Sequence, residues 1–282
     1  MPDGSTVIYR YDGSFDGLLC CVFESYEKKE IPSEILSPDA MQTSLFPEKE
    51  ILTDLQKSGR VLVSIPKTMG DAALDFVRKA FLTCLPEKER YILLFLRLGY
   101  RHGPSVMNML ADDTVNTLFK AVKYLNNEAH LHREFLRFSD FNGALVAEIE
   151  PNNYVLPFLT RHFCERFPEE RFFIHDRTHG MALVYQPHHC AIIPVDALEM
   201  PEPDEEEEHY RELWRLFYKT IEIQQRHNPK CRMGHMPKRY WKYMTEFQKP
   251  QERSGPRSPS EDTEKPKLLP PPQENLGQPL MK

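Results

Sequence analysis

Apolar residues recur every three to four positions in several stretches of the chain, the spacing that places them on one face of a helix. This pattern predicts helices over residues 15–28, 68–84, 86–99, 112–131 and 153–167. Another helix is expected after the acidic run Glu202–Glu208, with four apolar side chains on one face: Leu213, Trp214, Phe217 and Ile221. Pro237 favours a last short helix that ends near Phe247.

Short runs rich in β-branched and aromatic residues predict strands between these helices. The runs cover residues 7–11, 60–65, 135–141, 144–150, 171–177, 181–186 and 190–195. Residues 31–59 are polar and contain Pro32, Pro38 and Pro47. We therefore expect a loop-rich connector there.

The strongest local signal is Asn142-Gly143 between two alternating segments, because both residues tolerate the positive φ of a tight two-residue turn. The register that follows places Phe141 opposite Ala144 and Arg137 opposite Glu148. We expect a cross-strand ion pair between Arg137 and Glu148. One face of this hairpin is apolar and is expected to face the core: Leu136, Phe138, Leu145, Ala147 and Ile149.

Together these elements predict an α+β fold, in which an antiparallel sheet with a central Asn-Gly hairpin is covered by several helices. We expect a single domain over residues 1–248; a sub-boundary near residues 101–111 is the alternative. Residues 249–282 hold 8 of the 24 prolines and no aromatic residue. Such a composition cannot bury enough apolar surface to fold, so we expect a disordered Pro-rich C-terminal tail.

Composition and charge exclude several classes of protein. The 282 residues include 36 basic and 42 acidic side chains, a net charge of -6, which argues against a protein that coats nucleic acid over its whole surface. No apolar run approaches the roughly 20 residues of a membrane-spanning helix. The six cysteines include no C-x-x-C pair, and their scatter is typical of reduced cytosolic thiols. We expect a cytoplasmic protein with no membrane partner, no metal and no other cofactor.

A basic segment near the C-terminus is the first candidate for chemistry. Residues 226–245 contain six cations and no Asp or Glu, interleaved with Tyr240, Trp241 and Tyr243. Cations neutralise phosphates, and flat rings stack on unpaired bases. The alternative is a C-terminal helix whose rings pack on the core and whose cations meet the acidic run at Glu205–Glu208.

Histidines and carboxylates give further candidates. His130 and His132 are two residues apart, so on a helix they point in different directions and cannot chelate one metal ion. Asp176 follows His175 at a strand end, where an acid can orient a base or begin a turn. The chain has no G-x-S-x-G, Walker-type or G-x-G-x-x-G motif. The residues alone therefore assign no catalytic group.

Several segments, taken in order, resemble one family. The segments are Tyr9-x-Tyr11-Asp12-Gly13-Ser14-Phe15, Glu128-Ala129-His130 with Arg137-Phe138, His162-Phe163-x-x-Arg166-Phe167, Ile174-His175-Asp176, Leu213-Trp214-Arg215, Arg226-x-Asn228-Pro229 and Met236-Pro237-x-Arg239-Tyr240-Trp241. The chain resembles the bacterial family named "probable DNA metabolism protein" over about residues 7–247. It has Leu131 and Glu134 where the family pattern has Arg and Gly, which argues against a phosphate contact at that turn.

This resemblance implies a role in DNA metabolism or repair. Family members are usually encoded beside a radical-SAM protein of DNA modification or repair, and some are fused to a uracil-DNA-glycosylase-like domain. The resemblance implies DNA, single- or double-stranded, and the radical-SAM protein as partners. It makes the basic segment a DNA-binding candidate through Arg226, Asn228, Lys230, Arg232, Lys238, Arg239 and Trp241. It also suggests a polar pocket formed by His130, Arg137, His162, Arg166, His175 and Asp176.

Three functions remain open at this point. The first is a DNA-binding factor that acts with a radical-SAM enzyme. The second is a stand-alone hydrolase, nuclease or glycosylase-like, which requires Glu148, Asp176 and His162 to surround one cleft. The third is a non-catalytic interaction scaffold, for which Leu269-Pro270-Pro271-Pro272 offers a polyproline II ligand.

Overall fold

The computed structural model of the chain describes residues 7–38, 46–195 and 203–248. These residues belong to one unit, which ends at Gln248. The Pro-rich tail expected over residues 249–282 lies outside the described residues. Within the described part, none of the helices combines the length and the apolar character needed to cross a membrane.

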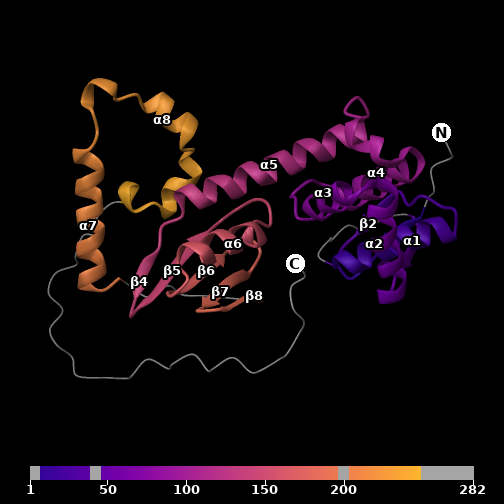
Figure 1. Cartoon of the computed structure of the whole chain (residues 1–282), viewed down its shortest axis with the longest axis horizontal. Coiled ribbons are helices and arrows are strands. Elements are labelled where there is room, and N and C mark those ends of the chain that lie inside the picture. The colour runs from indigo at the N-terminus through magenta and orange to yellow at the C-terminus, as the bar shows by residue number, and fades with distance from the viewer. Residues whose placement is uncertain (1–6, 39–45, 196–202, 249–282) are drawn as a thin grey trace. The chain divides into compact units, whose positions relative to one another are not determined.

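The N-terminal half consists of helices and one small sheet (Figure 1). Its elements are β1 (Ile8–Arg10), α1 (Phe15–Glu27), β2 (Glu34–Leu36), β3 (Glu48–Glu50), α2 (Leu55–Met69), α3 (Asp71–Phe81), α4 (Lys88–His102), the 3₁₀ helix η1 (Gly103–Asn108) and α5 (Asp113–Phe135). β1 pairs in parallel with β2 on one side and β3 on the other. Ser14 begins α1 as its N-cap, because its hydroxyl accepts a hydrogen bond of 2.9 Å from the Gly17 amide.

The strand predicted at residues 60–65 is wrong, because these residues lie inside α2. Val61, Ile65 and Met69 recur every four positions and are buried, whereas Val63 between them is exposed. A short apolar run fits both the two-residue period of a strand and the 3.6-residue period of a helix. Here the four-residue spacing continues to Met69, beyond the predicted strand, and this longer repeat identifies a helix. The connector expected at residues 31–59 also contains β2 and β3, each only three residues long.

The C-terminal half is built on a five-stranded sheet. Its elements are β4 (Ser139–Phe141), β5 (Ala144–Ile149), α6 (Leu156–Arg166), β6 (Arg171–Asp176), β7 (Met181–Gln186), β8 (His189–Pro194), α7 (Glu205–Thr220), η2 (Gln224–Arg226), α8 (Pro229–His235), η3 (Lys238–Tyr243) and η4 (Thr245–Phe247). The strand order is β4-β5-β6-β7-β8. β4 pairs antiparallel with β5, with Phe141 opposite Ala144, and Asn142 and Gly143 between them both have positive φ.

The expected all-antiparallel sheet is wrong, because β5 and β6 run parallel and make the sheet mixed. A parallel pair needs a long crossover, which α6 supplies between the two strands. Figure 1 shows α6 lying over the sheet. The position expected for the Asn-Gly turn is also wrong, since β4 forms an edge of the sheet and not its centre.

Two clusters of buried apolar side chains form the core. The first joins the small sheet to α1–α4, and the second lies between the five-stranded sheet and α6. α5 contributes to both, through Val115 and Leu118 in the first and Leu125 and Ala129 in the second. The sub-boundary considered near residues 101–111 falls on η1, whose Val106 is buried in the first cluster.

The apolar face expected for the hairpin packs as the alternation predicts. Leu136, Phe138, Leu145 and Ile149 all belong to or pack against the second cluster. The expected ion pair between Arg137 and Glu148 is wrong, because Arg137 pairs with Glu246 at 2.8 Å. β4 begins only at Ser139, so Arg137 lies outside the strand ladder and its side chain is free to turn away from β5.

Candidate functional site

The basic segment does not form one helix but a series of short helices, including α8 and η3. Asn228 is the N-cap of α8, where its side-chain oxygen accepts a hydrogen bond of 3.0 Å from the Cys231 amide. Pro237 precedes η3 in an extended conformation. The side-chain oxygen of Asn228 is occupied by this hydrogen bond, so in this structure Asn228 stabilises the start of α8.

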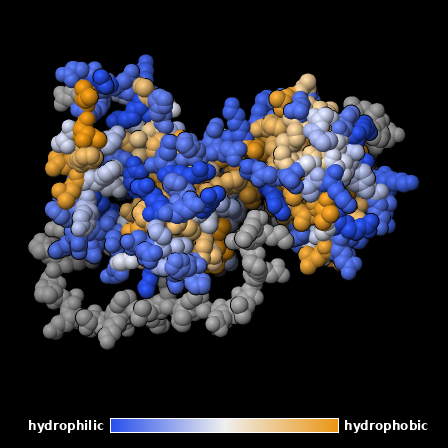
Figure 2. All heavy atoms as spheres, in the orientation of Figure 1, coloured by the Kyte–Doolittle hydropathy of each residue, from blue (hydrophilic) through white to orange (hydrophobic). Residues whose placement is uncertain are grey.

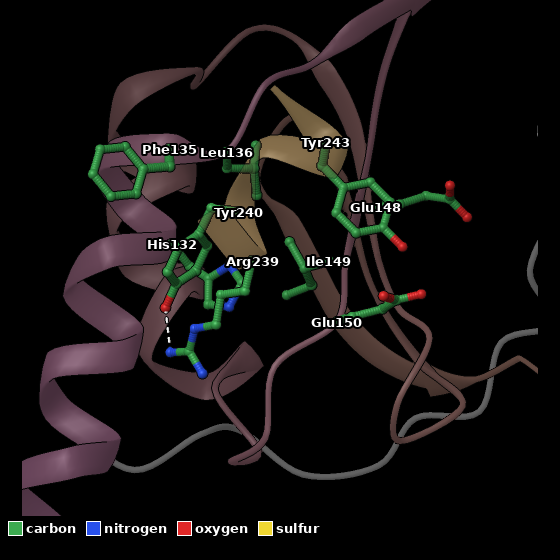
Figure 3. Close-up of a pocket in the computed structure, with 9 residues that line it drawn as sticks. All are labelled: His132, Phe135, Leu136, Glu148, Ile149, Glu150, Arg239, Tyr240 and Tyr243. Atoms are coloured by element: carbon green, nitrogen blue, oxygen red, sulfur yellow. Dashed lines mark hydrogen bonds between the residues drawn. The ribbon is translucent and has the colours of Figure 1, made fainter. Parts of the chain in front are cut away.

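Arg239 anchors the segment to α5. Its guanidinium lies 3.1 Å from the carboxylate of Glu128, which is fully buried. It also donates hydrogen bonds to the hydroxyls of Tyr124, at 3.0 Å, and Tyr240, at 2.6 Å. Figure 3 shows the second of these bonds as the dashed line. Burial alone would lower the pKa of Arg239, but these partners outweigh it and raise the pKa.

Glu128 also holds the loop that precedes α6. Its carboxylate accepts hydrogen bonds from the amides of Asn152, at 3.1 Å, and Asn153, at 2.8 Å, and from the side-chain amide of Asn153 at 2.6 Å. One buried carboxylate therefore connects α5, this loop and η3. Sequence reasoning did not select Glu128, although it opens the Glu128-Ala129-His130 segment of the family resemblance.

His132 lies one helical turn from Glu128 and lines a small pocket under η3 (Figure 3). Its ring makes an edge-on contact with the Tyr240 ring, with 5.0 Å between centroids. Its Nε2 atom is buried and has no hydrogen-bond partner. Burial lowers the pKa of His132 to about 4, so the ring is neutral at pH 7. The pocket has a free volume of about 20 Å³, which is space for one water-sized group.

Glu148 and Glu150 form another side of the same pocket (Figure 3). Lys242 lies 2.7 Å from Glu150, and its hydrogen bond is the largest cause that lowers the pKa of that carboxyl. Glu148 lies 3.5 Å from Nδ1 of His175, its neighbour on the adjacent parallel strand. Two of the six cations of the basic segment, Arg239 and Lys242, are therefore neutralised by carboxylates.

The remaining four cations have a different environment. Within the described ranges, Arg226, Lys230, Arg232 and Lys238 form no salt bridge with a carboxylate. Arg232 and Lys238 lie 5.4 Å and 5.9 Å from the centre of the Trp241 ring, a cation–π arrangement. The alternative, in which these cations meet the acidic run, does not occur for Glu207 and Glu208, which pair with Arg211 and Arg215 of their own helix.

Trp241 is half-buried beside these cations. Its ring stacks on Phe247 with 4.3 Å between centroids and 13° between planes, and its Nε1 donates to the Met236 carbonyl. One face of the indole is therefore occupied inside the protein. Nearby, a hollow of about 220 Å³ is lined by Glu222 and by five residues of the basic segment: Arg226, His227, Asn228, Cys231 and Arg232.

The structure does not gather the six polar-pocket candidates at one place. His130 is exposed and pairs with Glu134, and Arg137 pairs with Glu246. Arg166 is exposed and lies over the Phe167 ring. His162, on α6, has a pKa lowered by burial and then by Arg133 and Arg166.

His175 and Asp176 are neighbours on β6, but their side chains alternate across the sheet. Asp176 is fully buried and accepts hydrogen bonds from the amides of Thr178 and His179, so it holds the turn after β6. His175 instead lies against Glu148. Among the described residues, no group of three or more His, Cys, Asp or Glu side chains is placed to hold a metal ion.

Comparison with known protein families gives one match. The model of a domain of unknown function, DUF4130, matches residues 86–246, which run from the start of α4 to η4 and contain the whole basic segment. Neither the curated proteins nor the solved structures contain a match to this chain.

Proposed function

The chain belongs to the DUF4130 family, a domain of unknown function, and on this premise we propose that it is a DNA-binding protein of DNA metabolism or repair that works with a radical-SAM enzyme. Support for DNA as the ligand comes from the resemblance of its motifs to the bacterial DNA metabolism proteins. The observation that carries the proposal is that Arg226, Lys230, Arg232 and Lys238 lack carboxylate partners among the described residues. The radical-SAM partner rests on the resemblance alone.

The distinction between paired and unpaired cations decides which side chains would contact DNA. A cation that already neutralises a buried carboxylate adds little to the local potential, and removing it leaves a buried charge unpaired. Arg239 is of this kind, whereas Lys242 is paired with the exposed carboxylate of Glu150. Lys230 and Lys238 are exposed and unpaired within the described part of the chain, so a phosphate can take the counterion's place beside them. We therefore assign DNA contact to these lysines, together with Arg226 and Arg232, and a structural role to Arg239.

Fluorescence anisotropy with labelled single- and double-stranded DNA tests the proposal. The test variant is Lys230→Ala/Lys238→Ala, which removes two exposed cations of the segment. The matched control is Lys67→Ala/Arg78→Ala, which removes two exposed cations from α2 and α3. We expect weaker binding for the test variant only. Absence of binding by the wild-type protein, or equal loss in both variants, contradicts DNA binding through this segment.

The radical-SAM partnership has its own test. The tagged chain is expressed and purified together with a radical-SAM protein of the kind encoded beside the family members it resembles, with and without damaged DNA. Co-purification that survives nuclease treatment supports a direct complex, and recovery of the tagged chain alone under both conditions contradicts it. This outcome is independent of the anisotropy result, because the chain can bind DNA without this partner.

The contact between Glu148 and His175 favours a hydrolase as the second candidate function. The carboxylate lies 3.5 Å from Nδ1 of the imidazole on the adjacent strand without a hydrogen bond, so this contact must shorten in a substrate complex before the acid can orient the base. Asp176 and His162, the other residues this function requires, have separate partners. Incubation of damaged DNA with the wild-type protein and with Glu148→Gln tests this candidate. Cleavage or base release by the wild-type protein that the substitution abolishes supports a hydrolase. A wild-type protein that neither cleaves the DNA nor releases a base excludes it.

A further inference from the structure

Two cysteines approach each other between α6 and β8. Cys190 stands directly opposite Tyr185 in the antiparallel ladder of β7 and β8, so their side chains point to the same face of the sheet. Tyr185 is buried in the second apolar cluster, which lies between the sheet and α6, and Cys164 of α6 packs against the same cluster. Both cysteines therefore lie between the sheet and the helix that covers it.

The two thiols are close enough to interact. Cα atoms of α6 and β8 come within 8 Å of one another, and the Cys164 thiol donates a hydrogen bond to the sulfur of Cys190. Burial, followed by the charge and the hydrogen bond of Cys190, raises the pKa of Cys164 to about 12. Burial also raises the pKa of Cys190, and the same hydrogen bond opposes that rise, as expected for the acceptor. Both side chains are free thiols in this structure.

The pair lies at an edge of the five-stranded sheet. β8 is the last strand in the order, and Cys190 near its start is exposed, whereas Cys164 is half-buried. Ile193 of the same strand is 42% exposed, and Figure 2 shows hydrophobic residues at the surface in the part of the molecule that Figure 1 labels β7 and β8. An edge strand is paired on one side only and opens more readily than a central one. A covalent bond here would hold the strand to α6.

We propose that Cys164 and Cys190 are a redox modification site, at which a small-molecule disulfide such as oxidised glutathione converts the two thiols into one intramolecular disulfide. The exposed Cys190 sulfur attacks one sulfur of oxidised glutathione, forms a mixed disulfide and releases one glutathione, which takes the Cys190 proton. The Cys164 sulfur then attacks the Cys190 sulfur, and its own proton leaves with the second glutathione. Two protein thiols are oxidised, and one glutathione disulfide is reduced to two thiols.

The disulfide would close a loop of about 26 residues, which contains β6 and β7. Such a bond stabilises a protein mainly because it restricts the unfolded chain. In a reducing compartment the two thiols are the resting state, and a disulfide there is transient and depends on oxidation. The modification therefore ties the edge strand to α6 under oxidising conditions and releases it when the thiols are restored.

Peptide mapping by mass spectrometry tests the site in the full-length protein. The chain is incubated with oxidised glutathione, the remaining thiols are alkylated, and linked peptides are identified. We expect a linkage between Cys164 and Cys190 that dithiothreitol removes, and a midpoint of thermal unfolding at least about 4 °C above that of the reduced protein. Cys190→Ser should lose both the linkage and the shift. The matched control Cys231→Ser, which removes another exposed cysteine, should keep both.

Two results would overturn the proposal. In the first, Cys164 and Cys190 of the wild-type protein carry only glutathione or the alkylating agent and are not linked. In the second, either of them is linked to Cys84 or Cys231 instead, or the thermal shift survives in Cys190→Ser. Neither result depends on DNA binding, because Cys164 and Cys190 both lie outside the basic segment.

Discussion

Glu128 of α5 and Arg239 of η3 form an ion pair of 3.1 Å in which the carboxylate is fully buried. The pair joins the central helix to the segment that carries the unpaired cations. We predict that Arg239→Ala lowers the free energy of unfolding by about 1–3 kcal/mol, because it leaves a buried carboxylate without its cation. Glu128→Ala should cost more, about 3–5 kcal/mol, since it leaves Arg239 and three N–H donors without an acceptor.

Urea unfolding of the two single variants and of the double variant measures the coupling free energy between Glu128 and Arg239. The two effects should not add, because both substitutions disrupt one network. Lys242→Ala is the control, as its partner Glu150 is more exposed and the change should cost under about 1 kcal/mol. An Arg239→Ala protein that unfolds at the wild-type urea concentration but loses DNA binding would show that Arg239 contacts DNA and is not an anchor.

The buried ring of His132 predicts a specific dependence of stability on pH. Its pKa in the folded protein, about 4, lies below its ordinary value of 6.5. Between pH 4 and pH 6.5 the unfolded chain binds more protons at His132 than the folded protein does, so stability rises with pH. The contribution of the buried neutral ring to stability is therefore complete above about pH 6.5. It is lost as the pH falls toward 4, with a slope of at most about 1.4 kcal/mol per pH unit.

Replacing the imidazole removes this contribution. We expect the stability of His132→Gln to depend less steeply on pH between 6.5 and 4 than that of the wild-type protein, measured by urea unfolding at intervals of half a pH unit. His130→Gln is the matched control, because His130 is exposed on the same helix. Equal slopes for the wild-type protein and His132→Gln would show that the ring is not buried in its neutral form.

Two helical glycines should respond in opposite directions to alanine. A Cβ at Gly99 of α4 would overlap the side chain of buried Met69 on α2, whereas a Cβ at Gly59 meets nothing within 4 Å. Gly99→Ala is expected to destabilise the fold by about 1–2 kcal/mol through overpacking. Gly59→Ala should stabilise it by about 0.5–1 kcal/mol, since the unfolded chain loses conformational freedom. Thermal unfolding of both variants decides whether α2 and α4 approach as closely as described; a stabilising Gly99→Ala would refute it.

Asp176 should prove structural and not catalytic. Its carboxylate is fully buried and accepts from the amides of Thr178 and His179 and from the ring of His179. Asp176→Ala is therefore expected to cost about 2–3 kcal/mol, and Asp176→Asn less, because the amide oxygen keeps one acceptor. Asp140→Ala, which removes an acceptor for Gly143 at an exposed turn, should cost about 1 kcal/mol or less. Chemical denaturation orders the three variants, and an unaffected Asp176→Ala would leave the residue available for chemistry.

The parallel pairing of β5 and β6 can be predicted from the sequence. A strand over residues 144–150, a helix over 153–167 and a strand over 171–177 are the elements of a βαβ unit, and such a crossover favours parallel strands. The Asn-Gly turn is a stronger local signal than this spacing, and it favours an antiparallel sheet. The strand wrongly predicted at residues 60–65 has another cause, since a short apolar run does not distinguish a strand from part of a helix.

The site depends on contacts that local patterns do not encode. The Glu128–Arg239 pair forms only when η3 packs against α5, which is a property of the tertiary structure. The same holds for α7: its periodicity predicts an apolar face but not its direction, and the structure turns that face to solvent. The sequence does not distinguish the six cations of the basic segment from one another. Only the structure shows which of them are paired with carboxylates and which are unpaired among the described residues.

The dependence of DNA affinity on salt concentration tests the central claim most directly. For the wild-type protein and for Lys230→Ala/Lys238→Ala, the logarithm of the association constant is measured against the logarithm of salt concentration. We predict a negative slope for the wild-type protein and a slope less steep by about 1.4–1.8 for the variant, since each of the two phosphate contacts contributes about 0.7 to 0.9. A wild-type protein that does not bind, or two equal slopes, would contradict DNA binding by these cations.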